Sequence, residues 1–278
     1  MKVLVTGAKG QLGSDIEKHF IDMGHEVIGI DKDSLDLTNQ MSVRNYIRIF
    51  SPELVIHCAA YTAVDKAEDE REEAYAVNVT ATEHVASVCN EIGCAMVYFS
   101  TDYVFDGGGI EEWRPGDECN PINYYGKTKW LGENAVKEIV KKHYIIRVSW
   151  LFGKNGGNFV KTMLWLGDTG KTLKIIDDQI GSPTFTEDIA EAVHRLVDTG
   201  AEYGIYHLTN EGYCSWYEFA RKIFELSGKE VSVTPITTDE YPTNANRPQN
   251  SRMSKEKLYV AGVPRMPTWQ DALERYFA

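Results

Sequence analysis

Two residues with complementary chemistry, Tyr125 and Lys129, stand four positions apart. Residues at this spacing lie on one face of a helix, so the phenol and the ammonium are expected to be neighbours. A free tyrosine keeps its proton up to a pH of about 10, and a cation beside it favours the phenolate and lowers that pKa. A phenol tuned in this way can protonate a developing alkoxide, which is the proton-transfer half of a carbonyl reduction.

A run of polar residues, from Ser100 to Tyr103, closes a strand-like segment and supplies further groups for such a reaction. If the segment belongs to a parallel sheet, its carboxyl end presents them at the edge where active sites form. The Thr101 hydroxyl can then polarise a carbonyl. Taken alone, Thr101 is more often a turn residue, and Tyr–Lys pairs at this spacing occur on many solvated helices. Together with the glycine loop described next, these residues favour a catalytic set of Thr101, Tyr125 and Lys129.

Three glycines, Gly7, Gly10 and Gly13, stand between a strand-like run at 3–6 and a helical pattern. Such glycines permit a tight turn and let backbone N–H groups approach a pyrophosphate at the positive end of the helix. An ordinary glycine-rich turn is the alternative. The strand before the loop, the helix after it and Asp31 at the end of the next strand favour a dinucleotide site.

Asp31 also bears on which dinucleotide binds. An acidic residue at this place accepts hydrogen bonds from the adenosine ribose hydroxyls and repels a 2′-phosphate, so Asp31 favours NADH. Lys9 and Lys32 are near enough in sequence to tolerate the phosphate of NADPH. The sequence therefore predicts NADH or NADPH as the cofactor, with a preference for NADH.

The chain has 278 residues, 43% of them apolar, and a formal charge of −12. It can bury a sizeable core, and its acidic balance argues against general nucleic-acid binding. No apolar run is long enough to span a bilayer, and the strand-like run directly after Met1 and Lys2 leaves no room for a signal peptide. Five cysteines without a C-x-x-C pair indicate reduced thiols, and seven scattered histidines indicate no zinc site. We therefore expect a cytoplasmic protein with neither nucleic acid nor membrane as a partner.

Alternating strand-like and helical segments predict an α/β fold of Rossmann type, in which helices cover both faces of a doubly wound parallel sheet. After Trp150 the regular alternation of strand-like and helical segments gives way to shorter segments and glycine-rich loops. We therefore expect a dinucleotide-binding domain at 1–152 and a smaller, mainly substrate-binding α/β domain at 153–278, part of which crosses back to the first sheet. The expected strands are 2–6, 26–30, 54–58, 95–100, 144–148, 172–176 and 205–208. The expected helices are 11–23, 40–50, 67–90 (one or two), 127–142, 159–166, 187–197, 216–226, 255–259 and 269–276, with an irregular stretch at 234–252.

The glycine loop, Thr101 and the Tyr125/Lys129 pair together resemble the extended short-chain dehydrogenase/reductases, which bind nucleotide sugars. Three strings are similar to the dTDP-4-dehydrorhamnose reductase family, and the similarity runs nearly end to end. They are A-Y-T-A-V-D-K-A-E at 60–68, S-T-D-Y-V-F-D-G at 100–107 and R-P-Q-N-S-R at 247–252. The resemblance implies reduction of the C4 keto group of dTDP-4-dehydro-L-rhamnose to dTDP-L-rhamnose, a precursor of cell-envelope polysaccharide.

The resemblance also implies a role for each residue of the site. Tyr125 is the expected proton donor, Lys129 holds the nicotinamide ribose and lowers the tyrosine pKa, and Thr101 polarises the carbonyl. The expected cofactor-binding residues are Gly7, Gly10, Gln11, Leu12, Gly13, Asp31, Asp36, Leu37, Cys58, Ala59, Ala60, Tyr61, Asn78, Ser100, Tyr125 and Lys129. The expected substrate-binding residues are Asp102 and Tyr103 in the sugar pocket, Trp150 on the hexose, and Arg247 and Arg252 at the diphosphate or nucleotide. Arginine pairs bidentately with phosphate oxygens, although a plain exposed arginine is the alternative for either one.

Two other functions stay open on the same scaffold. The first is a nucleotide-sugar 4,6-dehydratase or epimerase. Dehydratases need an Asp-Glu pair directly after the threonine, whereas here Asp102 is followed by Tyr103, which has no carboxylate. Epimerases regenerate their bound cofactor, whereas a reductase must release it. The second is a non-catalytic protein of the type of the methionine adenosyltransferase regulatory subunit, which shares the fold and the strings. The complete set of active groups favours an enzyme.

A divalent metal is a further feature of some members of the resembled family, which build a site for it from acidic side chains at a dimer interface. Asp15, Glu187 and Asp188 are acidic at comparable places. Acidic residues near helix starts also simply complement the helix dipole. We therefore assign no metal, and both a monomer and a homodimer remain compatible with the sequence.

Overall fold

A sheet of six parallel strands forms the centre of the computed structural model, which describes residues 1–278. The inner strands are continuous apolar runs because helices cover both faces of the sheet. In spatial order the strands are β10 (Gly204–His207), β5 (His143–Val148), β4 (Ala95–Thr101), β3 (Leu54–His57), β1 (Lys2–Thr6) and β2 (Glu26–Ile30). The predicted Rossmann-type α/β fold is confirmed.

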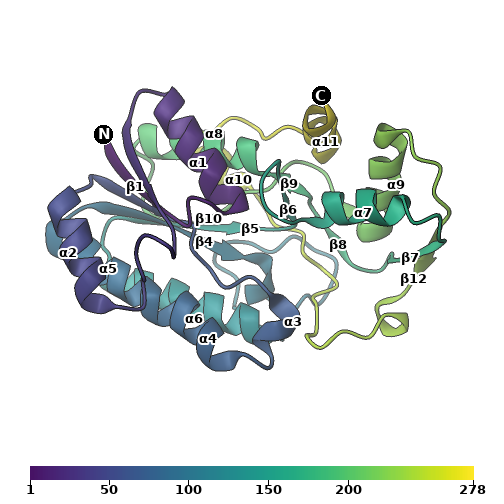
Figure 1. Ribbon diagram of the computed structural model, residues 1–278, viewed down its shortest axis with the longest axis horizontal. Coiled ribbons are helices and arrows are strands. Elements are labelled where there is room, and N and C mark those ends of the chain that lie inside the picture. Colours follow the sequence, from purple (N-terminus) through teal and green to yellow (C-terminus); the bar gives the residue numbers. More distant parts are fainter.

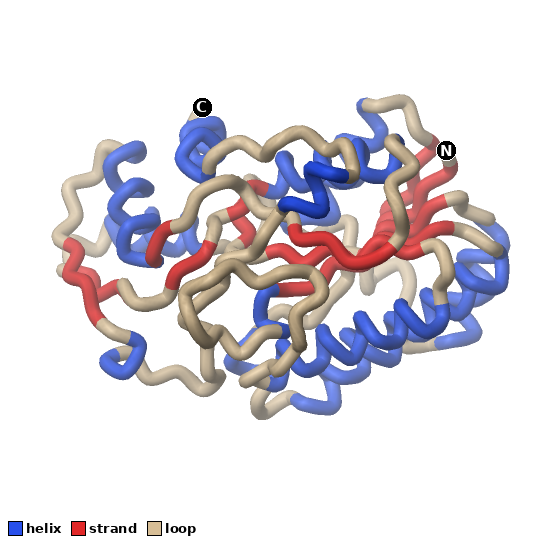
Figure 2. The backbone as a smooth tube through the Cα atoms, turned by 180° about the vertical axis from the view of Figure 1, so that it is seen from behind, coloured by secondary structure: helices blue, strands red, loops and turns tan.

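Helices pack on both faces of this sheet (Figures 1 and 2). The helices α1 (Gln11–Asp22), α8 (Thr186–Asp198) and α10 (Glu256–Val260) cover one face, and α2 (Gln40–Phe50), α5 (Ala81–Ile92) and α6 (Tyr124–Ile139) cover the other. Each layer has its own apolar core. Phe20 and Val193 belong to the first core, and Val43 and Val136 belong to the second.

The chain reverses its direction of travel across the sheet between β1 and β3. After β1 it adds β2 on one side, and it then returns to place β3 on the other side of β1. In open α/β sheets, ligands bind in the crevice outside the carboxyl ends of the strands at such a switch point. This topology therefore fixes the place of the site before any side chain is considered.

The rest of the chain forms a smaller part beside the carboxyl ends of the strands, at the right of Figure 1. Its three helices enclose a third apolar core that includes Phe152, Phe185 and Phe219. The helices are α7 (Phe159–Gly167), α9 (Trp216–Ser227) and α11 (Trp269–Phe277). Three short strand pairs complete it: β6 (Leu151–Phe152) with β9 (Thr184–Phe185), β7 (Leu173–Ile176) with β12 (Val233–Ile236), and β8 (Ile180–Gly181) with β11 (Cys214–Ser215).

Several boundaries differ from those predicted. The stretch expected as one or two helices is α3 (Val64–Ala67), α4 (Arg71–Tyr75), a π-helical segment (Ala76–Thr80) and α5. The helix expected at 127–142 spans 124–139. It begins three residues earlier because the Asn123 side chain accepts the Gly126 N–H at 2.7 Å and caps its first turn. The stretch expected as irregular at 234–252 contains most of β12 and a 3₁₀ turn (Thr238–Glu240), and a second 3₁₀ turn (Asp102–Val104) follows β4. No helix has the length and apolar character needed to cross a membrane.

Candidate active site

A cavity of about 960 Å³ lies at the carboxyl ends of the parallel strands, where the two parts of the chain meet. Its walls contain nearly all the residues that the sequence singled out. Those that line it are Gly7, Gly10, Gln11, Leu12, Gly13, Asp31, Asp36, Leu37, Cys58, Ala59, Ala60, Tyr61, Ser100, Thr101, Asp102, Tyr103, Tyr125, Lys129 and Trp150. Asn78, Arg247 and Arg252 do not line it.

The glycine loop brings the start of α1 against the cavity with no side chain in between. Gly7 has φ +66°, and a Cβ on it would stand 2.8 Å from the Ala59 nitrogen. A Cβ on Gly13 would stand 2.1 Å from the Gly7 carbonyl oxygen, so α1 can pack this closely only with glycine there. No side chain caps α1, and its first turn contains no acidic residue. Its free N–H groups and positive dipole end therefore suit an anionic group such as a pyrophosphate.

Two carboxylates line the cavity beyond the glycine loop. Asp31 follows β2 and accepts the N–H of Lys9 at 3.2 Å and of Lys32 at 2.7 Å. These bonds leave lone pairs on both carboxylate oxygens for further donors. Asp36 accepts the N–H and the hydroxyl of Thr38 at 2.9 and 2.7 Å, and these bonds lower the pKa of Asp36. The arrangement can receive the hydroxyls of a ribose.

Asn78 supports the cavity wall from behind. It is buried in the π-helical segment, where its Oδ1 accepts the Tyr61 N–H at 2.8 Å and its Nδ2 donates to the Tyr61 carbonyl at 3.1 Å. The same Nδ2 donates to the Thr128 hydroxyl at 2.9 Å. A single amide thus ties the loop after β3 to α6. Irregular turns of this π type recur at functional sites.

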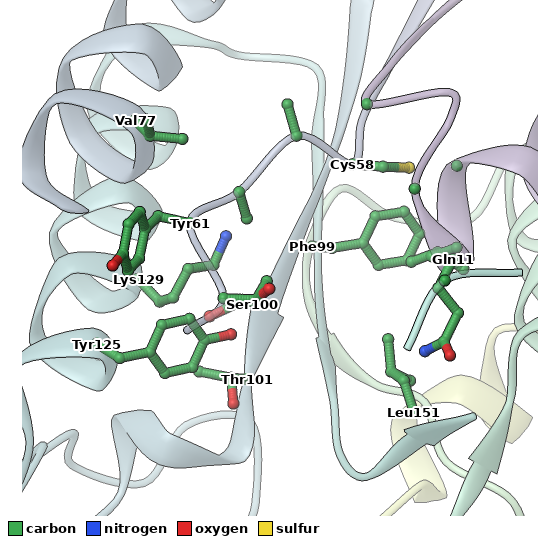
Figure 3. A pocket seen from close by; sticks show the side chains of 18 of the residues that line it. Gln11, Cys58, Tyr61, Val77, Phe99, Ser100, Thr101, Tyr125, Lys129 and Leu151 are labelled. Carbon is green, nitrogen blue, oxygen red and sulfur yellow. The ribbon is translucent and has the colours of Figure 1, made fainter. Parts of the chain in front are cut away.

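Three groups from two elements meet on one wall of the cavity. Thr101 ends β4, while Tyr125 and Lys129 lie in the first turns of α6. Figure 3 shows Tyr125 beside Thr101, with Lys129 extending its amine into the cavity and Gln11 on the opposite side. The Thr101 hydroxyl donates to Asp102 Oδ1 at 2.9 Å and accepts the Tyr103 N–H at 3.2 Å. Ser100 Oγ and Asp102 Oδ2 are buried without a partner, so the wall has polar capacity to spare for a ligand.

The electrostatics of this wall differ from the prediction. Burial raises the pKa of Tyr125, the charge of Asp102 adds to that effect, and the Thr101 hydroxyl opposes it. Burial also lowers the pKa of Lys129 to about 7, against the opposing charge of Glu133. Desolvation penalises the charged forms of both groups, so burial outweighs any lowering of the Tyr125 pKa by Lys129, and that effect of Lys129 stays a prediction.

Trp150 reaches the cavity from a strained backbone position. Its φ is +50°, in the left-handed region that non-glycine residues rarely adopt. Its ring stacks on Trp216 with centroids 3.5 Å apart, and a Cβ on Gly181 would stand 2.7 Å from the ring. The tight packing holds Trp150 in place and gives the cavity an aromatic wall, and strain of this kind persists only where the surroundings enforce it.

The two arginines are engaged outside the cavity. Arg247 donates to both carboxylate oxygens of Asp65, at 3.1 and 2.5 Å, and this bond raises the pKa of Arg247 against the effect of burial. Arg252 donates to Asn250 Oδ1 at 3.0 Å and lies over the Tyr213 ring. Neither guanidinium is part of the cavity wall.

The acidic residues considered for a metal are each engaged in contacts of their own or exposed. Asp15 accepts the Thr186 hydroxyl at 2.5 Å, and burial raises the pKa of Asp15. Asp188 accepts Asn210 Nδ2 at 2.7 Å and Arg275 Nη2 at 2.8 Å, while Glu187 is exposed. No group of three or more His, Cys, Asp or Glu side chains has a geometry that would hold a metal ion.

The whole chain, residues 1–278, matches the family model described as the RmlD substrate binding domain. The chain belongs to this family. The spore coat polysaccharide biosynthesis protein SpsK of Bacillus subtilis is 43% identical over 275 residues, which are 99% of this chain and 96% of that protein. A dTDP-4-dehydrorhamnose reductase from Clostridium acetobutylicum is 44% identical, with a TM-score of 0.96 over 99% of this chain and 98% of that chain. The corresponding enzyme from Bacillus anthracis, in complex with NADP, is 42% identical, with a TM-score of 0.96 over 99% and 98% of the chains. The family predicted from the sequence is confirmed.

Some lining residues of this RmlD-family site escaped the sequence analysis. They include Phe99, Ser149, Leu151, Gly156, Gly157 and Trp216. Gly156 and Gly157 could have been identified from the sequence, since they form a second glycine cluster after a strand. In the structure a Cβ on Gly156 would stand 3.2 Å from Gln11 Cβ, so this loop lies against the start of α1. Trp216 carried none, because the first residue of an amphipathic helix is ordinarily a packing residue.

Proposed function

We propose that this chain is an NAD(P)H-dependent reductase that converts the C4 keto group of dTDP-4-dehydro-L-rhamnose to the alcohol of dTDP-L-rhamnose. One observation carries the proposal. A tyrosine, a lysine and a threonine share the wall of a cavity that also receives the uncapped start of α1. Full-length relatives above 40% identity that carry this reductase's name support the substrate.

The residues of the cavity fit a dinucleotide along its length. The start of α1 receives the pyrophosphate, Asp31 the adenosine ribose, and Lys129 the nicotinamide ribose. When bound, the reduced nicotinamide supplies the hydride. The role of the chain is then to hold the sugar carbonyl beside it and to manage one proton.

Tyr125 delivers that proton to the oxygen of the reduced carbonyl. Because burial raises the pKa of Tyr125, the phenol is protonated at neutral pH and ready to act as an acid. Thr101 polarises the carbonyl. Its hydroxyl donates to Asp102 in this structure, so it must turn toward the substrate oxygen to do so.

The nucleotide sugar lies on the other side of the proton donor. Asp102, Tyr103 and Trp150 line the hexose pocket, and Arg247 and Arg252 take the diphosphate or nucleotide. Since Arg247 is engaged by Asp65, phosphate oxygens replace that carboxylate when the substrate binds. The hexose pocket is thus lined by residues before position 152, whereas the two arginines come from the part after it.

The choice between the two nicotinamide cofactors depends on Asp31 and the lysines beside it. Lys9 makes an ion pair with Asp33 at 3.0 Å, whereas Lys32 has no such partner. We propose that Asp31 gives a preference for NADH and that Lys32 permits NADPH. The ratio of kcat/KM for the two cofactors measures this preference, and a large excess for NADPH would contradict it.

A turnover assay tests the proposed function. Purified protein with the keto sugar and reduced cofactor is expected to lose nicotinamide absorbance in proportion to sugar, with dTDP-L-rhamnose as the product by NMR. Tyr125→Phe is expected to lower kcat by about 10²–10⁴-fold with little change in cofactor affinity, because only the proton donor is lost. An unchanged kcat in this variant would remove Tyr125 from its role.

The same assay separates the alternative functions. An epimerase or dehydratase alters the sugar without net oxidation of the cofactor, and a regulatory subunit binds without turnover. Either outcome with intact cofactor binding would replace the reductase proposal.

A further inference from the structure

The Lys129 ammonium has an unusual environment for a buried charge. Its side chain is 3% exposed, yet it makes no ion pair and its Nζ donates no hydrogen bond to the protein. The carboxylate one turn further along α6, Glu133, is engaged elsewhere, because both of its oxygens accept from Arg147, at 2.9 and 2.8 Å. Buried charges are normally paired, so the remaining contacts of this cation bear on its charge and position.

The charge of Glu133 favours the cation, but the group in direct contact with the ammonium is the ring of Tyr98 on β4. Lys129 Nζ lies 4.2 Å from the centroid of that ring, well within the range of a cation–π contact. Tyr98 is fully buried, and its hydroxyl donates to the Lys129 backbone carbonyl at 3.3 Å. The tyrosine therefore contacts both ends of the lysine, the main chain through its hydroxyl and the ammonium through its ring.

The sequence of α6 leaves room for this arrangement. A Cβ on Gly132 would stand 2.3 Å from the Tyr98 hydroxyl oxygen. Glycine in the middle of a helix costs about 1 kcal/mol relative to alanine. The glycine here has a packing reason, which is to let the Tyr98 ring lie under Lys129.

We propose that Tyr98 is a positioning residue for the reaction, whose ring stabilises the Lys129 ammonium and aims it into the cavity beside Tyr125. The inference rests on the proposed function, since it assumes that the ammonium binds the nicotinamide ribose. The other titratable neighbours do not supply the same support. His57 is fixed between Thr6 and Thr82 hydroxyls, with its pKa lowered to about 3 by burial, and burial raises the pKa of the Cys58 thiol.

A pair of isosteric side chains at position 98 tests the proposal. Tyr98→Phe keeps the ring and removes the hydroxyl, and 3,4,5-trifluorophenylalanine at the same position keeps the ring shape but removes its negative face. The readout is the dissociation constant of NADH and NADPH, measured by fluorescence between pH 6 and 9. Affinity is expected to fall as the pH rises through the pKa of Lys129, because the ammonium is lost.

The fluorinated ring is expected to move the midpoint of this fall to lower pH by about 0.5–1 unit relative to Tyr98→Phe. At a pH above both midpoints this is a three- to tenfold weaker affinity. The melting temperatures of the two variants are expected to agree, because their shapes match. Coincident midpoints would overturn the proposal, and so would a pH dependence that persists in Lys129→Met.

The outcomes for the two proposals are distinguishable. If the protein binds cofactor and reduces the keto sugar but the two ring variants titrate alike, only the role of Tyr98 fails. If the wild-type protein binds neither cofactor, the proposed function fails, and the role of Tyr98 fails with it.

Discussion

Burial of ionisable groups sets the chemistry of the cavity wall. Burial raises the pKa of Asp102 to about 6 and lowers that of Lys129 to about 7. Both groups therefore titrate near neutral pH, so bound ligands can change their charge. The sequence showed which side chains meet, through the four-residue spacing of Tyr125 and Lys129. It did not show how much water they lose, and that loss decides the direction of each pKa shift.

Asp102 makes a prediction about stability. Burial raises the pKa of Asp102 from 3.8 in the unfolded chain to about 6 in the folded protein. Between these two pH values the folded protein binds more protons than the unfolded chain. The free energy of unfolding therefore falls as the pH rises from 3.8 to about 6. Asp102→Asn removes this charge. The free energy of unfolding of the variant, relative to wild type, is expected to be higher at pH 8 than at pH 4 by roughly 2–3 kcal/mol. Urea denaturation at the two pH values measures the difference.

The exposed residue Asp239 provides the matched control for this prediction. Asp239→Asn is expected to leave the difference between the two pH values unchanged. If Asp102→Asn differs from wild type by the same free energy of unfolding at pH 4 and pH 8, ionisation of the buried carboxyl does not destabilise the folded protein.

At the scale of elements, short polar contacts decide where helices begin and how they meet. Asn123 caps α6 and so places Tyr125 and Lys129 in its first turns. Asn78 joins the loop after β3 to the same helix. Neither contact is visible in the periodicity of apolar residues, because each depends on a single polar side chain that meets a backbone group. The helical pattern predicted the existence of α6, and the cap fixed its start.

The packing of α1 on α8 contains three histidines and carries a second prediction. The Nε2 atoms of His25 and His194 lie 3.1 Å apart, so one must donate and the other accept, while the buried Nε2 of His19 has no partner. Burial lowers the pKa of all three. Their unfolded forms therefore take up protons first as the pH falls below about 6.5, and stability is lost there.

Replacement of the central histidine is expected to reduce this acid sensitivity. His194→Phe keeps an aromatic ring against Phe20, 5.2 Å away in the native packing. Between pH 7 and pH 5 the variant is expected to lose about 2–4 °C less in Tm than wild type. His84→Phe, on the opposite face of the sheet, is the control and is expected to follow wild type. If Tm falls equally with pH in wild type and in both variants, the three histidines do not cause the acid sensitivity.

At the scale of the whole molecule, the sequence predicted the layers of the fold and the place of the cavity, because alternation of strands and helices has few topological solutions. Glycine spacing, strand ends and the Tyr125/Lys129 pair located part of the wall, and the family resemblance supplied most of its other residues. Trp216 and the contacts of Arg247 lay beyond its reach. They depend on how the segments after residue 150 fold back, and nothing local in the chain encodes that path.

That path makes the last prediction, for the fragment 1–152. This fragment corresponds to the dinucleotide-binding part expected from the sequence, but the first sheet is not complete within it. Strand β10 pairs with β5, and α8 supplies Ile189, Val193 and Leu196 to the core on one face. Burying each such side chain contributes about 1.5–3 kcal/mol, so the three together approach the whole stability of a typical domain, about 5–15 kcal/mol.

The fragment is therefore expected to show no cooperative melting and poorly dispersed amide resonances. A fusion of 1–152 to 182–212 through a flexible linker restores α8 and β10, and recovery of a cooperative transition there is the expected control. A fragment 1–152 that melts cooperatively by itself would show that the face covered by α8 is not needed for folding.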